Sequence, residues 1–592
     1  MKLRRNAINL IMAMLITLAI SFLFQVVEMD DKGSFVVNFL AKLAVSFRFD
    51  YFVDLLAFLG SYFLITKFIR DEKLDVVSLT ISGIFSFLYV VGQSYAKYES
   101  MLLFTANTFQ FFIAVIVILG YWALFYLFIK MLLSALERAN ISHIVEKPSS
   151  NKLFLICFIV IAACYTAWSL MNCPGTFNPD AQQQVDQVLG NIDWENVHPP
   201  FGSIIMGGLY NLGRAMGSAT LGAYLYILLQ NLVCAAAFAY CIKKIYEWGA
   251  GIKACVWTLL FFAINPFWLT YAQLYNKDQL YVGIMTFFTM LIADVIKRKE
   301  ILTKDIIKIT VLAILAALLR KNGIYSIVPT LFLLIFAANK VEKKKVLASL
   351  VGIILVYELV NKALYPAIGI KDGSIKEALS IPFQQTANYV KYYGEDVTSE
   401  EKEIIDAVLD YDSIAENYKP FLSSPVKDTY KEDSSKLPAY FEVWFKMFFK
   451  HPGSYMNAFM CNYSGYMAPV YSDLAGVDIE AGKWELKREM THASGNGPLI
   501  IKQVKLLGEQ LPIFKYLGDP GVYTWLLVLA TVLLIKKKKY KEIIFFIPNI
   551  MNLAVCFASP LNGSSRYALP LIAMAPFYIF WTIRNYKNET EI

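Results

Sequence analysis

Long apolar runs separated by short polar segments make up most of this chain. A membrane-spanning helix needs about 20 mostly apolar residues, and about fourteen segments approach that length. The pattern therefore predicts an all-α polytopic membrane protein with about fourteen transmembrane helices. The predicted spans are 7–27, 51–69, 76–95, 111–133, 153–173, 219–242, 254–271, 279–296, 306–319, 323–338, 346–364, 521–535, 543–558 and 567–583.

Basic residues between the runs predict which ends face the cytoplasm. Lys and Arg concentrate in cytoplasmic turns, so Lys2, Arg4 and Arg5 place the N-terminus inside. The first apolar run is longer than the core of a signal peptide and lacks a clear cleavage site, so we expect it to remain as a span. Alternation from there puts the C-terminus inside, together with the turns 67–73, 137–152, 243–253, 297–308, 339–345 and 536–541.

One further apolar segment, 201–217, is not counted as a span. Counting it would place the basic turn 243–253 outside, so we expect an interfacial helix instead.

The chain then divides into four parts. They are an N-terminal four-span module (1–150), a transmembrane core (151–364) whose first outer loop is 172–218, a small α-rich extracytoplasmic domain (365–520) and a C-terminal three-span segment (521–592).

Composition agrees with a membrane protein. Charged residues make up 17% and hydrophobic residues 57%, whereas soluble domains carry about 25% charged residues. The net charge of +8 comes from Lys and Arg in the turns, so we expect no nucleic-acid partner. The eight Cys lie mostly in apolar runs as small buried side chains, and the four His show no metal-ligand spacing.

Polar side chains gather in the segments predicted to face outside. Several have a structural alternative: Asp180 as the N-cap of a short helix at 181–189, His198 as part of a turn, and the group 276–278 as a solvated turn. For Arg320 and Lys321 the alternative is that the predicted sidedness is wrong at this turn. These candidate site residues are Asp180, His198, Asn276, Lys277, Asp278, Arg320, Lys321, Asn322, Arg566 and Tyr567.

The outer cations indicate an anionic ligand. Basic residues are expected to avoid this face, and guanidinium groups suit phosphate, so we expect Arg320, Lys321 and Arg566 to bind the phosphate of a lipid-linked donor. A carboxylate such as Asp180 can take the proton of an acceptor hydroxyl that attacks a sugar, with inversion at the anomeric carbon. Metal use stays open: Asp180 and Asp278 are the carboxylates for a Mg²⁺ or Mn²⁺ ion, or the cations act without one.

The sequence HPPFG at 198–202 is similar to the HPPLG of protein O-mannosyltransferases. Together with the acidic first outer loop, the Arg566-Tyr567 pair and the long outer insert, it resembles the GT-C superfamily of membrane glycosyltransferases. The resemblance implies a GT-C-like core from about residue 153 onward, a polyprenyl-phosphate sugar donor, and Asp180 as catalytic base. The acceptor stays open among an envelope glycan, a lipid and a protein.

The chain also departs from that family. Members often carry Asp-Glu in the first loop, whereas Ala181 follows Asp180 here. The four N-terminal spans precede the GT-C-like core and have no role that the resemblance indicates. The other acids of the loop could share or take over the role of the base: Asp186, Asp193 and Glu195.

A transporter or flippase of lipid-linked glycans is the alternative function. Transporters place ionisable residues near the bilayer midplane and are often built from repeats. Here the charged residues of the spans lie near their ends and no internal repeat is evident, which favours the enzyme. We expect it in a bacterial plasma membrane, with its active site outside. In the outer insert, Gln384 and Gln385 are weaker candidates for sugar contacts, the alternative being an ordinary folded surface.

Overall fold

The structure is a computed structural model of the chain. It describes residues 2–28, 34–69, 75–138, 146–470, 499–500, 502–504, 506, 511 and 516–586. Parts of the predicted turns 67–73 and 137–152, part of the predicted extracytoplasmic domain at 471–498, and the C-terminal residues 587–592 lie outside these ranges. Of the described residues, 79% are helical, and a single two-residue strand pair is the only sheet among them, so the all-α prediction is confirmed.

The chain forms two compact units. The first contains 1–141, 379–471 and 560–563, and the second contains 142–378, 472–559 and 564–592. These boundaries come from contacts within the fold, so the four-part division made from the sequence stays a prediction.

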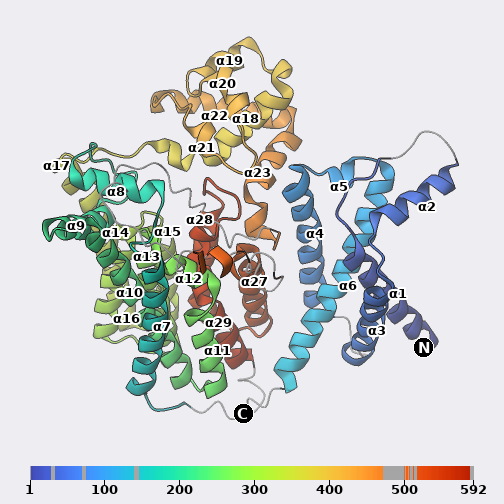
Figure 1. Ribbon diagram of the computed structural model, residues 1–592, viewed down its shortest axis with the longest axis horizontal. Coiled ribbons are helices and arrows are strands. Elements are labelled where there is room, and N and C mark those ends of the chain that lie inside the picture. Colours follow the sequence, from blue (N-terminus) through green and yellow to red (C-terminus); the bar gives the residue numbers. More distant parts are fainter. Residues whose placement is uncertain are drawn as a thin grey trace. The chain divides into compact units, whose positions relative to one another are not determined.

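The first unit begins with a group of N-terminal helices (Figure 1). Gly120 lies where two of them approach closely, since a Cβ atom there would be 2.2 Å from the Leu15 carbonyl oxygen. The helices are α1 (Lys2–Ser21), α2 (Phe35–Ser46), α3 (Tyr51–Phe68), α4 (Val76–Tyr98), α5 (Leu102–Thr105) and α6 (Thr108–Arg138). The sequence pattern did not predict α2, a 12-residue apolar helix too short to span a bilayer.

Short helices from the predicted outer domain complete the first unit. Its core contains Phe383 and Tyr440, whose rings meet edge to face at 5.7 Å. Gln384 and Gln385 are buried and donate to the carbonyls of Lys419 and Tyr455, so Gln384 bonds to a turn and Gln385 bonds to a neighbouring helix. The α-helices are α18 (Ser380–Tyr393), α19 (Ser399–Asp406), α20 (Tyr411–Asn417), α21 (Ser424–Lys427), α22 (Leu437–Lys450) and α23 (Pro452–Met467).

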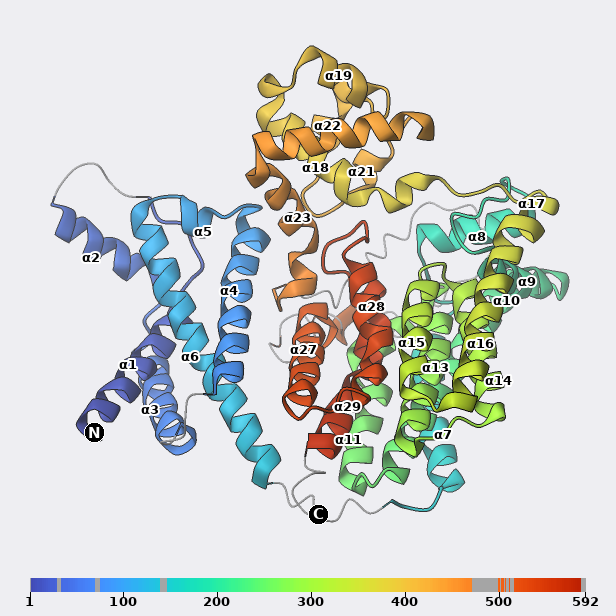
Figure 2. The same cartoon turned by 180° about the vertical axis from the view of Figure 1, so that it is seen from behind.

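The second unit is a larger helical bundle (Figure 2). Its core includes Phe288, Ile309 and Ile327, from three successive helices. The helices in its first stretch, 142–378, are α7 (Asn151–Met171), α8 (Pro179–Leu189), α9 (Pro200–Ala215), α10 (Ala219–Glu247), α11 (Ile252–Ala263), α12 (Pro266–Ala272), α13 (Asp278–Arg298), α14 (Thr303–Leu319), α15 (Gly323–Ala337), α16 (Lys340–Leu359) and α17 (Tyr365–Ala367). After it come α27 (Pro520–Lys536), the 3-10 helix η6 (Glu542–Phe546), α28 (Ile547–Cys556) and α29 (Ser565–Tyr586).

Eight helices in the described part of the chain are long and apolar enough to cross a bilayer. They are α3, α4, α6, α7, α10, α13, α29 and the continuous stretch Lys340–Ala367. A ninth results if α11 and α12, bent by 48°, form one span. The structure thus supports a membrane protein, but not the number fourteen.

The other predicted spans coincide with shorter helices. At 1.5 Å per residue, a helix of 15 to 17 residues is roughly 25 Å long, below the ~30 Å of the hydrocarbon core. They are the apolar part of α1 (Arg5–Ser21), α14, α15, α27 and Glu542–Cys556.

The segment predicted as interfacial is the helix α9. One face is buried through Met206 and Tyr210, while Ile204 and Leu212 on the other face are exposed. Gly213 lets α9 approach α10, because a Cβ atom there would lie 2.2 Å from the Gly222 Cα. The segment is therefore a helix, as predicted, and its position at the bilayer surface stays a prediction.

Candidate functional site

A short pairing of backbone strands joins the first two segments that are predicted to face outside. Strand β1 (Thr176–Phe177) runs parallel to β2 (Leu274–Tyr275), and the rings of Phe177 and Tyr275 stack at 4.7 Å. Both strands lead directly into helices, α8 after β1 and α13 after β2. Residues that follow the two strands are therefore placed at one end of the bundle.

Asn178, and not Asp180, caps α8. The Asn178 side-chain oxygen accepts a hydrogen bond from the Ala181 amide at 2.9 Å, and Pro179 occupies the first helical position. The prediction that Asp180 is the N-cap was wrong, because the residue before a helix-starting Pro already fills that role. The carboxylate of Asp180 is consequently available for other contacts.

Arg566 connects two carboxylates from different helices. Its Nη2 donates to Asp180 Oδ2 at 2.5 Å, and its Nε donates to Asp278 Oδ2. Asp278, the first residue of α13, is fully buried, and the Arg320 Nη1 atom lies 3.3 Å from its other oxygen. Two carboxylates and two guanidinium groups thus alternate in one cluster, in the order Asp180, Arg566, Asp278 and Arg320.

Lys277 and His198 lie on the Asp180 side of this cluster. Lys277 Nζ donates to His198 Nδ1 at 2.6 Å and lies 3.9 Å from Asp180 Oδ2. Because Nδ1 accepts, the ring hydrogen is on Nε2, which is 3.1 Å from the Gln183 side-chain oxygen and 3.9 Å from Asp180 Oδ1. His198 therefore links Lys277 to the helix that carries Asp180.

Burial and neighbouring charges shift the pKa values of this group. Burial alone would raise the pKa of Asp180, but Arg566 and Lys277 hold it well below its usual range. Burial and the Lys277 charge lower the pKa of His198 to about 3, so the imidazole is neutral at pH 7. Burial also lowers the pKa of Lys277 to about 8, against the attraction of Asp180. With Lys277 protonated, three cations face two carboxylates, and one positive charge is in excess.

Two tyrosine rings pack against the guanidinium groups. The guanidinium carbon of Arg320 lies 5.2 Å from the centre of the Tyr567 ring and 5.6 Å from that of Tyr281. Arg566 is 5.9 Å from the Tyr567 ring, and Asn552 fixes the Tyr567 backbone through a 3.1 Å bond to its carbonyl. Distances within about 6 Å are favourable for cation–π contacts.

Three predicted site residues have other roles or positions. The side-chain oxygen of Asn276 accepts from the amides of Asp278 and Gln279, which caps α13. Lys321 Nζ donates to the Asn196 carbonyl, and burial lowers its pKa. Asn322 is exposed at the start of α15 and makes no side-chain capping bond. The structure thus separates Arg320, which joins the cluster, from its neighbour Lys321.

The other acids of the loop 172–218, which is predicted to face outside, have partners of their own. Asp186 accepts from the Asn191 side chain at 2.9 Å, and Asp193 pairs with Lys371 at 2.8 Å. Glu195 forms a backbone bridge to Lys371. Asp180 is therefore the carboxylate of this loop that joins the Arg566 cluster.

The donor set does not suit a divalent cation. Within the described ranges, no group of three or more His, Cys, Asp or Glu side chains could hold a metal ion. Asp180 and Asp278 share the Arg566 guanidinium between them, so their oxygens already face a cation. The Arg566 guanidinium thus lies where a Mg²⁺ or Mn²⁺ ion between the two carboxylates would have to bind.

Two members of the site were missed from the sequence. Gln183 contacts His198, and Tyr281 packs against Arg320. Each lies three residues after a predicted site carboxylate, Asp180 or Asp278, on a predicted helix. The i, i+3 spacing, which places side chains on one helix face, could have indicated both.

A protein-family model described as "Family of unknown function (DUF6020)" matches residues 194–591, more than half of the chain. The matched region contains His198, Lys277, Asp278, Arg320 and Arg566, whereas Asp180 precedes it. No curated protein and no solved structure matches the chain.

Proposed function

The chain belongs to this family of unknown function, and we propose that it is a membrane glycosyltransferase. In this proposal it moves a sugar from a polyprenyl-phosphate donor to an acceptor on the extracytoplasmic side, with inversion. The observation that carries the proposal is the Arg566 guanidinium shared by Asp180 and Asp278, with Lys277 and Arg320 beside it.

The cluster has the charge and geometry for a phosphate. Arg guanidinium groups donate two parallel hydrogen bonds to phosphate oxygens, and the cluster carries one excess positive charge. The Asp180 side chain is 32% exposed and that of Arg566 is 19% exposed, whereas Asp278 is fully buried. Asp180 and Arg566 can therefore meet a ligand, while Asp278 positions Arg566 and Arg320.

The donor phosphate competes with Asp180 for the same cations. When Arg566 and Lys277 turn to the phosphate, Asp180 loses the charges that hold its pKa down. Its carboxylate then becomes a stronger base at the moment the donor is bound. Donor binding thus prepares the group that activates the acceptor.

The transfer step follows from this arrangement. The acceptor hydroxyl oxygen forms a bond to the anomeric carbon as the bond from that carbon to the phosphate oxygen breaks. The hydroxyl proton moves to Asp180, and the phosphate leaves with the bonding electron pair. Arg566, Arg320 and Lys277 stabilise the charge that grows on the phosphate.

Asp180→Asn tests the proposal. The full chain in proteoliposomes receives undecaprenyl-phosphate hexoses and pentoses labelled in the sugar, and the release of undecaprenyl phosphate is measured. We expect the variant to be slower by about 10²–10⁴-fold. Donor binding should not weaken, because a competing carboxylate has been removed. Asp193→Asn, which changes an exposed acid of the same loop, should retain wild-type turnover.

The same assay separates the enzyme from a transporter. An enzyme cleaves the bond between sugar and phosphate, whereas a flippase moves the intact donor across the bilayer. Translocation of uncleaved donor would replace the proposed function. Near-wild-type release by Asp180→Asn would remove Asp180 as the base.

A further inference from the structure

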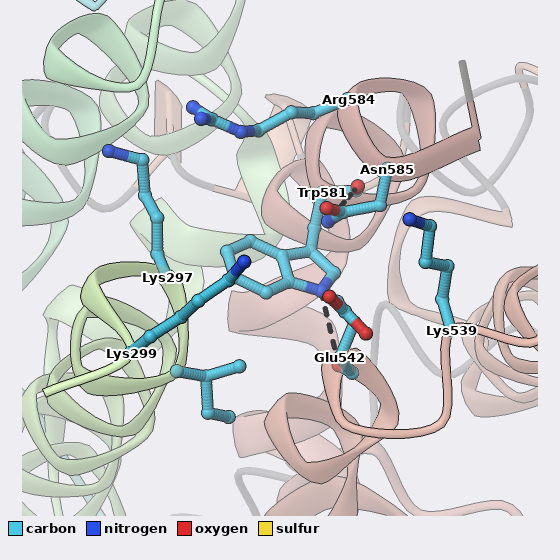
Figure 3. Close-up of a pocket in the computed structure, with 8 residues that line it drawn as sticks. Lys297, Lys299, Lys539, Glu542, Trp581, Arg584 and Asn585 are labelled. Carbon is cyan, nitrogen blue, oxygen red and sulfur yellow. Dashed lines mark hydrogen bonds between the residues drawn. The ribbon is translucent and has the colours of Figure 1, made fainter. Parts of the chain in front are cut away.

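A second group of cations lies at the opposite ends of two helices that build the candidate site. Helix α13 begins at Asp278 and α29 begins next to Arg566, and their C-terminal ends border a pocket of about 370 Å³. Figure 3 shows basic side chains reaching around the Trp581 indole from different segments. The pocket lining includes Lys297, Lys299, Lys539, Glu542, Trp581 and Arg584.

The pocket wall is held in place by hydrogen bonds. The Trp581 indole nitrogen donates to the Glu542 carbonyl at 3.1 Å, and the Asn585 side chain donates to the Trp581 carbonyl at 2.9 Å. Arg584 Nη1 donates to the Trp248 carbonyl at 2.5 Å, which orients its guanidinium. Four basic side chains therefore surround a fixed aromatic ring, with the Glu542 carboxyl as the acidic group in the lining.

Two of these cations already converge on one acidic oxygen. Glu146 Oε1 lies 2.6 Å from Lys297 Nζ and 3.3 Å from Arg584 Nη2. The two basic side chains are 13% and 14% exposed, whereas that of Glu146 is 64% exposed. An exposed carboxylate thus occupies a position where two largely buried cations can receive an anionic oxygen, which is the geometry that a phosphate oxygen needs.

We infer that this pocket binds a phosphate group, carried by an anionic lipid headgroup or free in solution, and that Glu146 competes with it. The location at the ends of apolar helices is one where basic pockets receive lipid headgroups. The pocket shares no side chain with the Arg566 cluster, so the inference does not depend on the proposed transfer reaction.

Binding can be measured by native mass spectrometry on the full chain in detergent. The probes are phosphatidylglycerol, phosphatidylcholine and inorganic phosphate, each added alone and in competition. We expect phosphatidylglycerol to bind and phosphatidylcholine not to. Displacement by millimolar inorganic phosphate would identify free phosphate as the ligand source, and resistance to it would identify the lipid.

Paired variants assign the binding to this pocket. Lys299→Gln with Lys539→Gln should weaken phosphatidylglycerol binding about 25-fold, at about fivefold for each lysine. Lys343→Gln with Lys344→Gln removes the same charge from an exposed stretch of α16 and should leave binding unchanged. Glu146→Gln should tighten binding, because the competing carboxylate is lost.

Three results would overturn the inference. They are equal binding of phosphatidylglycerol and phosphatidylcholine, equal losses in the two double variants, and weaker binding in Glu146→Gln. Thermal unfolding of each variant shows whether it is folded. Lys297 and Arg584 are left intact because they also hold Glu146 and the Trp248 carbonyl.

Discussion

Arg566 is the side chain on which both carboxylates of the candidate site depend. Asp278 is fully buried, and a buried carboxylate without a cation costs several kcal/mol. A guanidinium can donate to two carboxylates in different directions from Nε and Nη2, which the compact ammonium of a lysine cannot reproduce with the same geometry. One arginine thus fixes the distance between the partly exposed Asp180 and the buried Asp278.

In the proposed function, Lys277 would make donor binding depend on pH. Its pKa of about 8 means that Lys277 loses its charge above that pH. We expect the affinity for undecaprenyl phosphate to fall as the pH rises through about 8. In Lys277→Arg the fall should move to much higher pH, because guanidinium keeps its proton. Binding titrations across the alkaline range check this, and identical pH profiles for both proteins would contradict it.

The same shift has a consequence for stability. The pKa of Lys277 is lower in the folded protein than its ordinary value of 10.5. Between these two pH values the unfolded chain binds more protons, so the free energy of unfolding rises with pH over that window. The Lys277→Arg variant should lack this rise, which serves as the control that the titrating group is Lys277.

Among the elements, the strand pair β1–β2 is only two residues long, but it positions two segments of the candidate site. It holds together the two segments that continue into Asp180 and Asp278. Gly175 precedes it with φ of +108°, and a Cβ atom there would lie 2.4 Å from the Gln273 carbonyl oxygen. Both the backbone angle and the contact therefore require glycine.

Gly175→Ala should damage both stability and the site. The strained backbone and the clash together should lower the free energy of unfolding by roughly 2 kcal/mol or more. Donor binding should weaken as β1 moves away from β2. Gly208→Ala on α9, where no atom lies within 4 Å of the added Cβ, is the matched control and should be neutral or slightly stabilising. Equal thermal unfolding of the two variants would contradict the role given to the strand pair.

The apolar runs predicted where the long helices lie. They did not predict the short helix α2, the N-cap of α8 or the strand pair. Each predicted span contains a helix or a bent pair, because about 20 apolar residues leave few other structures in lipid. The helix α2 was missed because its apolar run is short. The cap of α8 was misjudged because Asn178 and Asp180 are both good N-caps, and only the position of Pro179 between them decides. A strand pair two residues long has no periodicity from which it could be predicted.

Over the whole molecule, charge counting predicted more of the candidate site than any motif did. The prediction that Asp180, Asp278, Arg320 and Arg566 share one face came from the alternation of basic turns, and the structure brings these four side chains into contact. The sequence could not separate Arg320 from Lys321, since adjacent residues in a turn point in different directions. The pocket around Trp581 was not predicted either, because its lysines are ordinary cytoplasmic-turn residues by sequence alone.

The sidedness of the chain depends on short helices such as α15, which makes α15 the decisive one to test. It has 15 residues, or about 22 Å, so it crosses only where the bilayer thins or neighbouring helices shield its ends. Asn322 and Lys343 are exposed on either side of it. In intact cells, a membrane-impermeant maleimide should label Asn322→Cys, and Lys343→Cys only after permeabilisation. The unsubstituted chain gives the background from its native cysteines, of which six are buried and two are intermediate. Labelling of both positions from the same side would mean that α15 does not cross, and Arg320 could then not serve an extracytoplasmic donor site together with Asp180.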